Sequence, residues 1–274
     1  EALEETRLIN NLYKSFVEDF MSISVITGIK SESEKFAGAE QTYCIEALMQ
    51  DGKALQAGTS HFLGQNFAKA FDVKFSTENG SLEYVWATSW GVSTRLMGAL
   101  IMSHGDDHGL VLPPKLSPYQ VIIIPVFKTP DDLELINQYL EKLKQQLIKL
   151  DIDFKIDERD NVSPGKKFNE YEIKGVPIRL CVGLRDIENK TIELFRRDEM
   201  KKLTISVNDA SKQIKKLLFE IQENLLKKSK KFIKNNTKIA NNYSEFKSMI
   251  EDGGFVLAHW DGTNESEQKI KKET

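Results

Sequence analysis

The sequence predicts an α+β region, then a compact α/β domain, then a shorter α/β module at the C-terminus. Three observations lead to this prediction. Over about the first 117 residues, helical and strand-like segments follow one another without the regular βαβ alternation of a parallel sheet. A proline-rich stretch, Gly105–Pro118, then indicates a linker. Beyond it, a buried strand, a long amphipathic helix and further strands follow in the order expected of an α/β domain.

The first region is expected to begin with an amphipathic helix over Leu3–Met21, where apolar residues recur at helical spacing. Alternation and runs of β-branched or aromatic residues predict strands over Ile23–Ile29, Thr42–Leu48 and Glu83–Thr88. We interpret Gly58–His61 as a loop that enters a helix over Phe62–Phe71, and expect a further helix over Thr94–His104.

Past the linker, Gln120–Val126 is predicted to be a buried strand. A helix start follows, with Thr129 as N-cap, Pro130 in the first turn and two aspartates at the positive end of the helix dipole. Further strands are expected over Phe154–Asp157, Ile178–Val182 and Lys190–Arg196. The remaining chain predicts a basic helix, a polar stretch, one short strand and a charged tail without a closing element, at Asp209–Phe232, Lys234–Asn242, Phe255–His259 and Glu265–Thr274.

Composition excludes several classes of protein. The chain has 274 residues and is 40% hydrophobic, which is enough to bury more than one core. No apolar run approaches the roughly 18 residues of a membrane span, and the acidic N-terminus lacks the apolar core of a signal peptide. Cys44 and Cys181 lie far apart with no CxxC spacing, so we expect reduced thiols and a cytoplasmic protein. The first residue is not Met, which suggests a piece of a longer chain.

Charge is distributed unevenly, although the net charge is only −3. Residues 1–117 carry 9 Lys and Arg against 15 Asp and Glu, whereas residues 118–274 carry 29 against 26. Within Val207–Ala240 there are nine lysines and three acids. Because phosphate binding depends on local positive patches, the second half is the better place to expect RNA. The alternative is that these lysines only solvate a helix face.

Two segments of the first region are candidates for binding an anionic ligand. Gly58–His61 places two hydroxyls and an imidazole where a helix is expected to open, which favours a carboxylate or phosphate. Ser89–Arg95 adds a glycine that permits close backbone approach, followed by an arginine that can fork onto phosphate or stack on a base. Ordinary helix capping and a surface arginine are the alternatives.

Three other groupings have weaker support. His104–His108 holds both imidazole and carboxylate ligands for a metal, but a turn next to prolines rarely provides the convergent geometry. Glu34 and Glu46 are conceivable as an acid–base pair, with surface charge as the alternative. Asp157–Arg179 mixes an aromatic with acidic and basic groups, a combination suited to splayed RNA bases, although a solvated loop would have the same composition.

Taken together, several blocks of sequence resemble the prolyl-tRNA synthetases of the type shared by archaea, eukaryotes and some bacteria. The blocks in the first region are Glu34–Ala39, Thr42–Ala47, Lys53–Lys69, Thr88–Arg95 and His104–Pro114. Those in the second are Pro164–Phe168, Glu172–Arg179 and Arg196–Asp198. The resemblance implies a class II antiparallel-sheet catalytic domain, here incomplete, over residues 1–117. It also implies an anticodon-binding domain over 118–208 and a partial C-terminal module over 209–274.

The resemblance implies a role for individual side chains. Arg95 matches the arginine of the third class II motif and is the expected catalytic residue, while Gln56, Ser93 and Arg95 match positions that contact ATP. The positions that match the proline pocket are Phe36, Thr59, His61, Trp90 and Gly91. The positions that match readers of the anticodon are Phe168, Glu172, Arg179 and Lys201.

The resemblance further implies the substrates and partners of a ligase: proline, ATP with magnesium, and proline tRNA, in a family whose members form homodimers. The first two class II motifs, including the dimer motif, lie outside this sequence. Several relatives carry a four-cysteine zinc module that this chain lacks, so no zinc is expected. The alternative function is a non-catalytic synthetase-like protein that binds tRNA.

Overall fold

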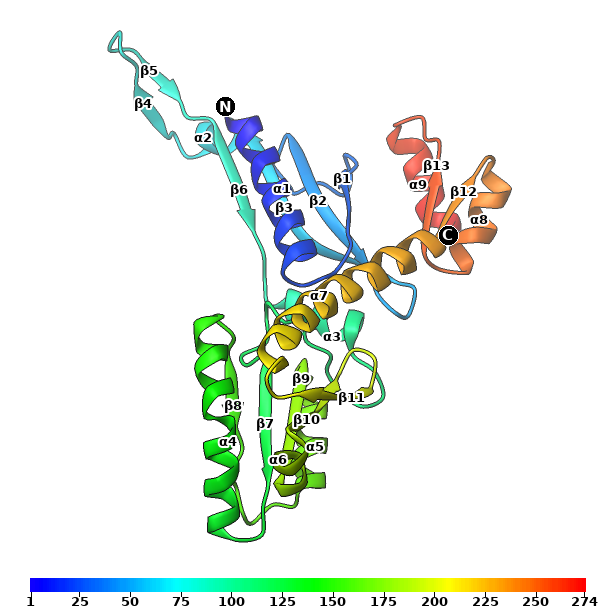
Figure 1. Ribbon diagram of the computed structural model, residues 1–274. Coiled ribbons are helices and arrows are strands. Elements are labelled where there is room, and N and C mark those ends of the chain that lie inside the picture. Colours follow the sequence, from blue (N-terminus) through cyan, green and yellow to red (C-terminus); the bar gives the residue numbers. More distant parts are fainter. The chain divides into compact units, whose positions relative to one another are not determined.

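The computed structural model describes residues 1–274. Its contacts divide the chain into two compact units (Figure 1). Unit 1 contains residues 1–19, 23–103 and 229–274, and unit 2 contains residues 20–22 and 104–228. None of the helices is both long and apolar enough to cross a lipid bilayer.

Unit 1 is built on a four-stranded antiparallel sheet in the order β1-β2-β3-β6. The strands span Ile26–Ile29, Gln41–Leu48, Ala54–Gly64 and Ala87–Gly91. The predicted N-terminal helix is present as α1, Ala2–Asp19, and it covers one face of the sheet. The absence of a side chain at Gly58 of β3 lets α1 approach, because a Cβ there would lie 3.2 Å from the ring of Tyr13. Gly58 and Ser60 therefore point to the α1 face, and Thr59 and His61 to the other face.

Our prediction of a loop at Gly58–His61 leading into a helix over Phe62–Phe71 is wrong, because these residues lie in β3. The strand is hydrogen-bonded on both sides, by β2 and by β6, so its polar residues do not mark a loop. The helix begins only after this strand, as α2, Asn66–Ala70. The strand expected over Glu83–Thr88 is also two strands: β5, Leu82–Tyr84, which pairs with β4, Lys74–Ser76, and then β6. Helix α3 spans Arg95–His104, close to the prediction.

The C-terminal part of unit 1 is a small βαβα module, drawn in orange and red in Figure 1. Strands β12, Thr237–Ala240, and β13, Phe255–Ala258, are parallel, and α8, Tyr243–Glu251, joins them. The charged tail, for which no closing element was expected, forms helix α9, Asn264–Glu273. Thr263 caps this helix, acids occupy its first turn and lysines its last, so its charges complement the helix dipole.

Unit 2 is a mixed five-stranded sheet in the order β11-β10-β9-β7-β8. Strand β7, Val121–Val126, is parallel to β8, Phe154–Ile156, and to β9, Ile178–Gly183. Strands β10, Thr191–Arg196, and β11, Lys201–Ser206, continue the sheet antiparallel. Strands β7 to β10 lie where the sequence predicts strands.

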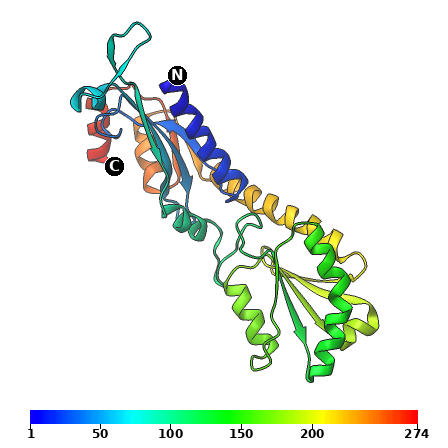
Figure 2. The ribbon, with the colours of Figure 1, turned by 90° about the vertical axis from the view of Figure 1, so that its left-hand side faces the viewer.

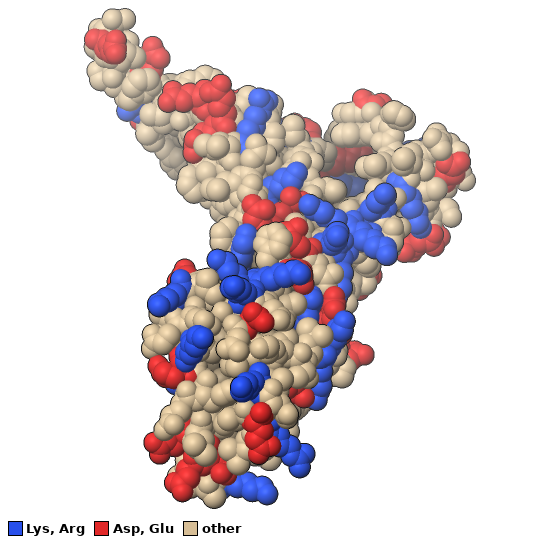
Figure 3. All heavy atoms as spheres, viewed as in Figure 1, with Lys and Arg blue, Asp and Glu red and all other residues tan.

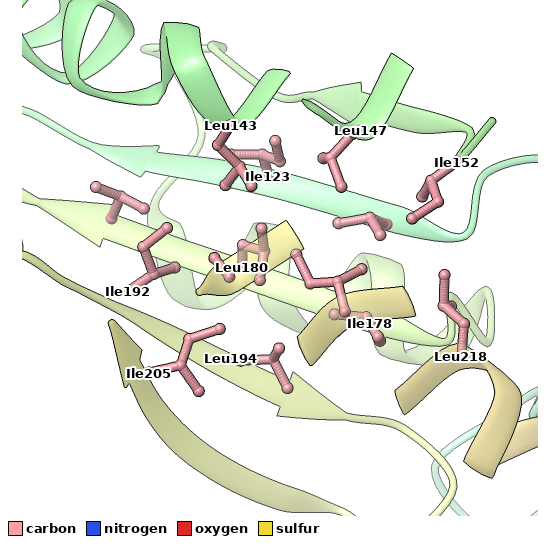
Figure 4. Close-up of a cluster of buried hydrophobic side chains, with 14 of the residues drawn as sticks. Ile123, Leu143, Leu147, Ile152, Ile178, Leu180, Ile192, Leu194, Ile205 and Leu218 are labelled. Carbon is pink, nitrogen blue, oxygen red and sulfur yellow. The ribbon is translucent and has the colours of Figure 1, made fainter. Parts of the chain in front are cut away.

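Two helices cover one face of this sheet, and one covers the other (Figure 2). Helix α4, Pro130–Lys149, begins with the predicted cap, since Thr129 accepts from the amide of Asp132 and Asp132 accepts from the amide of Thr129. Its leucines pack with α7, Ala210–Asn235, against Ile123, Leu180 and Leu194 of the strands (Figure 4).

Three elements of unit 2 were not predicted: α5, Pro164–Ile173, α6, Leu184–Asn189, and β11. Helix α5 lies inside the segment for which a solvated loop was the alternative interpretation. It starts with proline at its first turn and buries Tyr171 and Lys167 against the opposite face of the sheet. A lysine in the buried face of this helix is not expected from its sequence. Lys167 is accommodated there because it donates to the carbonyl of Asp157 and faces its carboxylate.

Candidate functional site

The face of the unit 1 sheet away from α1 gathers the polar side chains of three strands. Residues that lie directly opposite in an antiparallel ladder point to the same face. Thr42 is paired with His61, and His61 with Ser89. Thr59 is paired with Gly91 of β6. A Cβ on Gly91 would have no neighbour within 4 Å, so the space above it is open to a ligand.

His61 is fixed by a hydroxyl and by an aromatic ring. The Oγ1 of Thr42 lies 3.0 Å from Nδ1 of His61 and accepts a hydrogen bond of 2.9 Å from the amide of Phe36. The Thr42 hydroxyl keeps its own proton and a second lone pair, so it can donate to Nδ1 or accept from it, according to the imidazole tautomer. The Phe36 ring lies 4.8 Å from the imidazole, centroid to centroid. Burial lowers the pKa of His61, which favours the neutral ring near pH 7.

Trp90 does not join this cluster. It is paired with Ser60, whose side chain points to the α1 face, so the indole lies on the face opposite His61. The structure thus brings together four of the five predicted proline-pocket residues: Phe36, Thr59, His61 and Gly91. The expectation that Phe36 and Trp90 wall the same pocket does not match this register, because each one-residue step along a strand reverses the face.

The three residues predicted to contact ATP meet at the start of α3. The Nη1 of Arg95 donates to the backbone carbonyl of Gln56 at 3.3 Å, and the amide of Arg95 donates to the hydroxyl of Ser93 at 3.3 Å. The Arg95 side chain is exposed. A guanidinium has five donors on a flat, delocalised plane, so Arg95 keeps both a stacking face and further donors for an anion.

A lysine–carboxylate pair that sequence reasoning missed lies further along the same sheet face. Lys30 forms an ion pair with Glu46, whose carboxylate also accepts a weak hydrogen bond from the thiol of Cys44 at 3.9 Å. Glu34 instead pairs with Lys271, so Glu34 and Glu46 do not form the acid–base pair considered above. Strand alternation from Thr42 to Glu46 was the available signal, but it needed the correct sheet partner for β2.

The residues of the candidate metal cluster have separate partners. His104 is buried, with Nε2 2.8 Å from the carbonyl of Met21. Asp106 receives two hydrogen bonds from Arg197, and His108 lies beside Glu172. Among residues 1–274, no group of three or more His, Cys, Asp or Glu side chains is arranged to hold a metal ion.

Unit 2 carries a second cluster, centred on Arg179. Its guanidinium carbon lies 4.0 Å from the ring centre of Phe168 and 4.4 Å from that of Phe195, so it is stacked between two aromatic rings. Its Nη1 is 3.9 Å from a carboxylate oxygen of Glu172. The residue is only 5% exposed, its Nε has no hydrogen-bond partner, and burial lowers its pKa. Three of the four predicted anticodon readers, Phe168, Glu172 and Arg179, therefore lie together.

Lys201, the fourth predicted anticodon reader, lies on the sheet face opposite Arg179 according to the strand register. Phe195 is paired with Arg179 and with Lys202, whereas Lys201 is paired with Arg196. Lys202 is therefore the lysine on the Arg179 face, where it lies 3.5 Å from Glu193. Sequence reasoning missed Lys202 because β11 itself was not predicted.

His108 is a further residue of this cluster that was not expected there. Its Nδ1 lies 3.5 Å from the Glu172 carboxylate, and its side chain is 60% exposed. The predicted linker places His108 there because it packs against the end of α5, where the amides of Leu110 and Leu112 donate to the carbonyls of Ile173 and Gly175.

Lys and Arg side chains gather over α7, the helix predicted to be basic (Figure 3).

Known proteins are similar to this chain both in its second half and over its whole length. Residues 120–217 match the family model of an anticodon binding domain. A proline–tRNA ligase of Cytophaga hutchinsonii is 60% identical over 275 aligned positions, which cover all of this chain and 56% of that protein. One from Porphyromonas gingivalis is 55% identical over 274 positions, again covering all of this chain and 56% of the relative.

A solved structure is similar over almost the whole chain. The crystal structure of prolyl-tRNA synthetase from Cryptosporidium parvum, complexed with L-proline and AMP, superimposes with a TM-score of 0.92 at 42% identity. It covers 99% of this chain and 58% of that one. The chain thus spans a little over half the length of these relatives. The resemblance to prolyl-tRNA synthetases and the fold class predicted from the sequence are both confirmed.

Proposed function

We propose that this chain, all of which aligns with a part of proline–tRNA ligases, is the C-terminal part of such an enzyme. The observation that carries the proposal is the convergence of Phe36, Thr59, His61 and Gly91 on one sheet face, in a chain 60% identical to a proline–tRNA ligase. The reaction has two steps. A carboxylate oxygen of proline attacks the α-phosphorus of ATP and releases pyrophosphate. A ribose hydroxyl at the 3′ end of proline tRNA then attacks the carbonyl carbon and releases AMP.

Proline would bind above Thr59 and Gly91. The substrate offers an apolar ring, which would pack on Phe36, and polar groups, which would meet the Thr59 hydroxyl and the free Nε2 of neutral His61. Packing supplies limited discrimination, about 1–3 kcal/mol per methylene group, so polar contacts must share in the selection. Trp90, on the other sheet face, would contribute its backbone beside Gly91 rather than a wall of the pocket.

ATP would lie against Arg95, with the guanidinium stacked on adenine and facing the phosphates, and with Gln56 and Ser93 as further contacts. Arg95 is the catalytic residue of this proposal, because it would stabilise charge on the nucleotide during the attack. Magnesium would accompany the phosphates of ATP and offset their charge. The described residues offer no group of three metal-ligating side chains, so we assign none of them to the ion.

The anticodon of proline tRNA would be read at the Arg179 cluster. One face of the Phe168 ring is already covered by the Arg179 guanidinium, so a base would stack on the other face. The Glu172 carboxylate would accept hydrogen bonds from a guanine edge, while Arg179 would donate to a base acceptor. Lys202 shares this face, and we propose it in place of Lys201 as the lysine that meets the anticodon stem-loop.

The proposal also covers domain limits and assembly. The catalytic part would span residues 1–117, the anticodon-binding domain 118–208 and the C-terminal module 209–274. The complete enzyme would act as a homodimer, as the resemblance implies. The remaining catalytic motifs would come from sequence outside this chain.

The test is proline-dependent exchange between ATP and pyrophosphate by the complete protein that contains this chain. Exchange that requires proline, together with prolyl transfer to proline tRNA, is the expected result. No exchange, with anticodon-dependent binding of proline tRNA retained, would instead establish the alternative of a non-catalytic tRNA-binding protein.

A further inference from the structure

The loop that carries Phe36 is held from two directions. It joins β1 to β2, and its pocket side is fixed where the Phe36 amide donates to Thr42 and the Phe36 ring lies against His61. At its other end, residues 31–35 form a helical turn, in which the amides of Glu34 and Lys35 donate to the carbonyl of Ser31. This turn faces helix α9 of the C-terminal module (Figure 2).

Two side chains of α9, Glu267 and Lys271, bind the turn at residues 31–35. They lie four residues apart and therefore on the same side of the helix. One carboxylate oxygen of Glu267 accepts from the hydroxyl of Ser31 at 2.5 Å and from that of Ser33 at 2.7 Å. Lys271 donates to the Ser33 hydroxyl at 2.7 Å and forms an ion pair with Glu34. Lys271 also lies 3.2 Å from Glu267, so the five groups form one connected network.

Burial distinguishes this network from an exposed ion pair. Glu267 is 9% exposed, and its second carboxylate oxygen is buried without a hydrogen-bond partner. A buried carboxylate is costly to desolvate unless hydrogen bonds compensate, and the two serine hydroxyls supply them. These hydrogen bonds also lower the pKa of Glu267, so its charge persists near pH 7.

Helix α9 can hold the loop in place because α9 is itself bound within the C-terminal module, and the module is bound to the sheet. Within the module, Glu273 accepts from the Tyr243 hydroxyl at 3.1 Å and pairs with Lys247, and Trp260 donates to Ser266 at 2.7 Å. The module makes a further backbone contact with the sheet where the Gly254 amide donates to the Gly52 carbonyl, in the turn between β2 and β3.

We infer that Glu267 and Lys271 are positioning residues for the amino-acid pocket, acting through the Ser31–Ser33 turn on the placement of Phe36. This inference rests on the proposed function. It gives the C-terminal module a task in selecting the amino acid, although neither residue is part of the pocket. Loss of the network frees the turn, and with it the aromatic ring that packs on proline, while Arg95 and the nucleotide contacts stay in place.

The experiment compares variants of the complete enzyme in pyrophosphate exchange. Glu267→Ala should raise the KM for proline about tenfold, the factor that corresponds to a charged hydrogen bond, with the KM for ATP changed less than about twofold. Glu267→Gln keeps an acceptor for both hydroxyls and should recover most of the loss. The double variant Ser31→Ala/Ser33→Ala should match Glu267→Ala, and adding it to Glu267→Ala should cost little more, because both remove the same contacts.

Gln268→Ala is the matched control, since Gln268 is an exposed residue of α9 next to Glu267 and makes none of the contacts of the network. Hydrogen exchange of the peptide covering residues 30–40 gives a second readout: Glu267→Ala should accelerate it and Gln268→Ala should not. An unchanged KM for proline in Glu267→Ala, or equal increases of both KM values and of loop exchange in the two α9 variants, would overturn the inference. A wild-type enzyme without proline-dependent exchange would instead refute the proposed function.

Discussion

Arg197 forms two parallel hydrogen bonds with the carboxylate of Asp106, a residue 91 positions earlier in the chain, at 2.7 and 2.5 Å. The arginine is 1% exposed, and its Nε also donates to the carbonyl of Glu172. Paired carboxylate–guanidinium contacts of this kind are directional as well as strong. The pair therefore fixes the predicted linker against the domain that carries the Arg179 cluster.

Removing the carboxylate should destabilise unit 2. Asp106→Ala leaves a buried guanidinium without its counter-charge, and we expect a loss of about 3 kcal/mol in the free energy of unfolding. Hydrogen bonding from Arg197 holds the pKa of Asp106 below its ordinary value. Its contribution is therefore complete above the unfolded pKa of about 3.9 and is lost as pH falls through the lower folded value. Urea unfolding at pH 7 and below pH 4 measures both effects, with Asp107→Ala as the neighbouring control.

Arg95→Ala should impair adenylate formation far more than tRNA binding. Removal of one preorganised group that stabilises charge typically lowers kcat by about 100-fold or more. Pyrophosphate exchange measures the loss, and a binding assay with proline tRNA should show little change. Arg7→Ala is a suitable control, because Arg7 contacts the Tyr43 hydroxyl on the α1 side of the same sheet. Unchanged exchange in Arg95→Ala would mean that ATP binds elsewhere.

Glu172→Ala should have the converse effect. Loss of a charged acceptor should reduce the preference for the correct anticodon by about tenfold while sparing pyrophosphate exchange. Aminoacylation of proline tRNA and of a transcript with an exchanged anticodon measures the preference. Glu188→Ala, an exposed acid of α6 in the same unit, should alter neither assay. Equal losses in both assays would contradict the division of labour between the two clusters.

The two neighbouring lysines of β11 offer a test of register. Lys202→Ala should weaken binding of proline tRNA about threefold to tenfold and reduce its salt dependence, since it removes one positive charge from the Arg179 face. Lys201→Ala serves as the matched variant, with an effect below about twofold. If the order is reversed, the RNA contacts the other face of the sheet.

Cys181 should make stability fall in alkaline solution. Burial raises the pKa of this thiol to about 11, above the unfolded value of about 8.5. The folded state therefore keeps the proton that the unfolded chain releases, and stability decreases as the pH rises between these values. Cys181→Ala should reduce this slope in urea unfolding between pH 8 and pH 10. A slope equal to that of the wild type would show that the thiol ionises without unfolding.

The sequence predicted best where one local rule was sufficient. Thr129 and Pro130 predicted the start of α4 because a helix cap is chosen by its neighbours in the chain. The resemblance supplied the candidate residues, but it could not supply the sheet face on which each one lies. Trp90 and Lys201 each stand one residue from the position that shares a face with their predicted partners, and only the pairing of strands decides this.

The remaining errors have related causes. Gly58 was interpreted as a loop residue, whereas its missing side chain accommodates Tyr13, a contact between segments distant in sequence. Helix α9 was overlooked although Thr263 and its charged ends marked it, because its face is anchored by Glu267 and Lys271 instead of by apolar residues. A helix that is held by polar contacts shows no hydrophobic periodicity in its sequence, so this pattern could not predict α9.

The division of unit 1 into separate stretches of chain affects the order of events during synthesis. Residues 104–228, which form most of unit 2, leave the ribosome before residues 229–274, which complete unit 1. At about ten residues per second, several seconds separate the two. During that interval the turn at Ser31 and Ser33 lacks Glu267 and Lys271, the two side chains of α9 that bind it. Unit 1 can therefore be completed only after all of unit 2 has been synthesised.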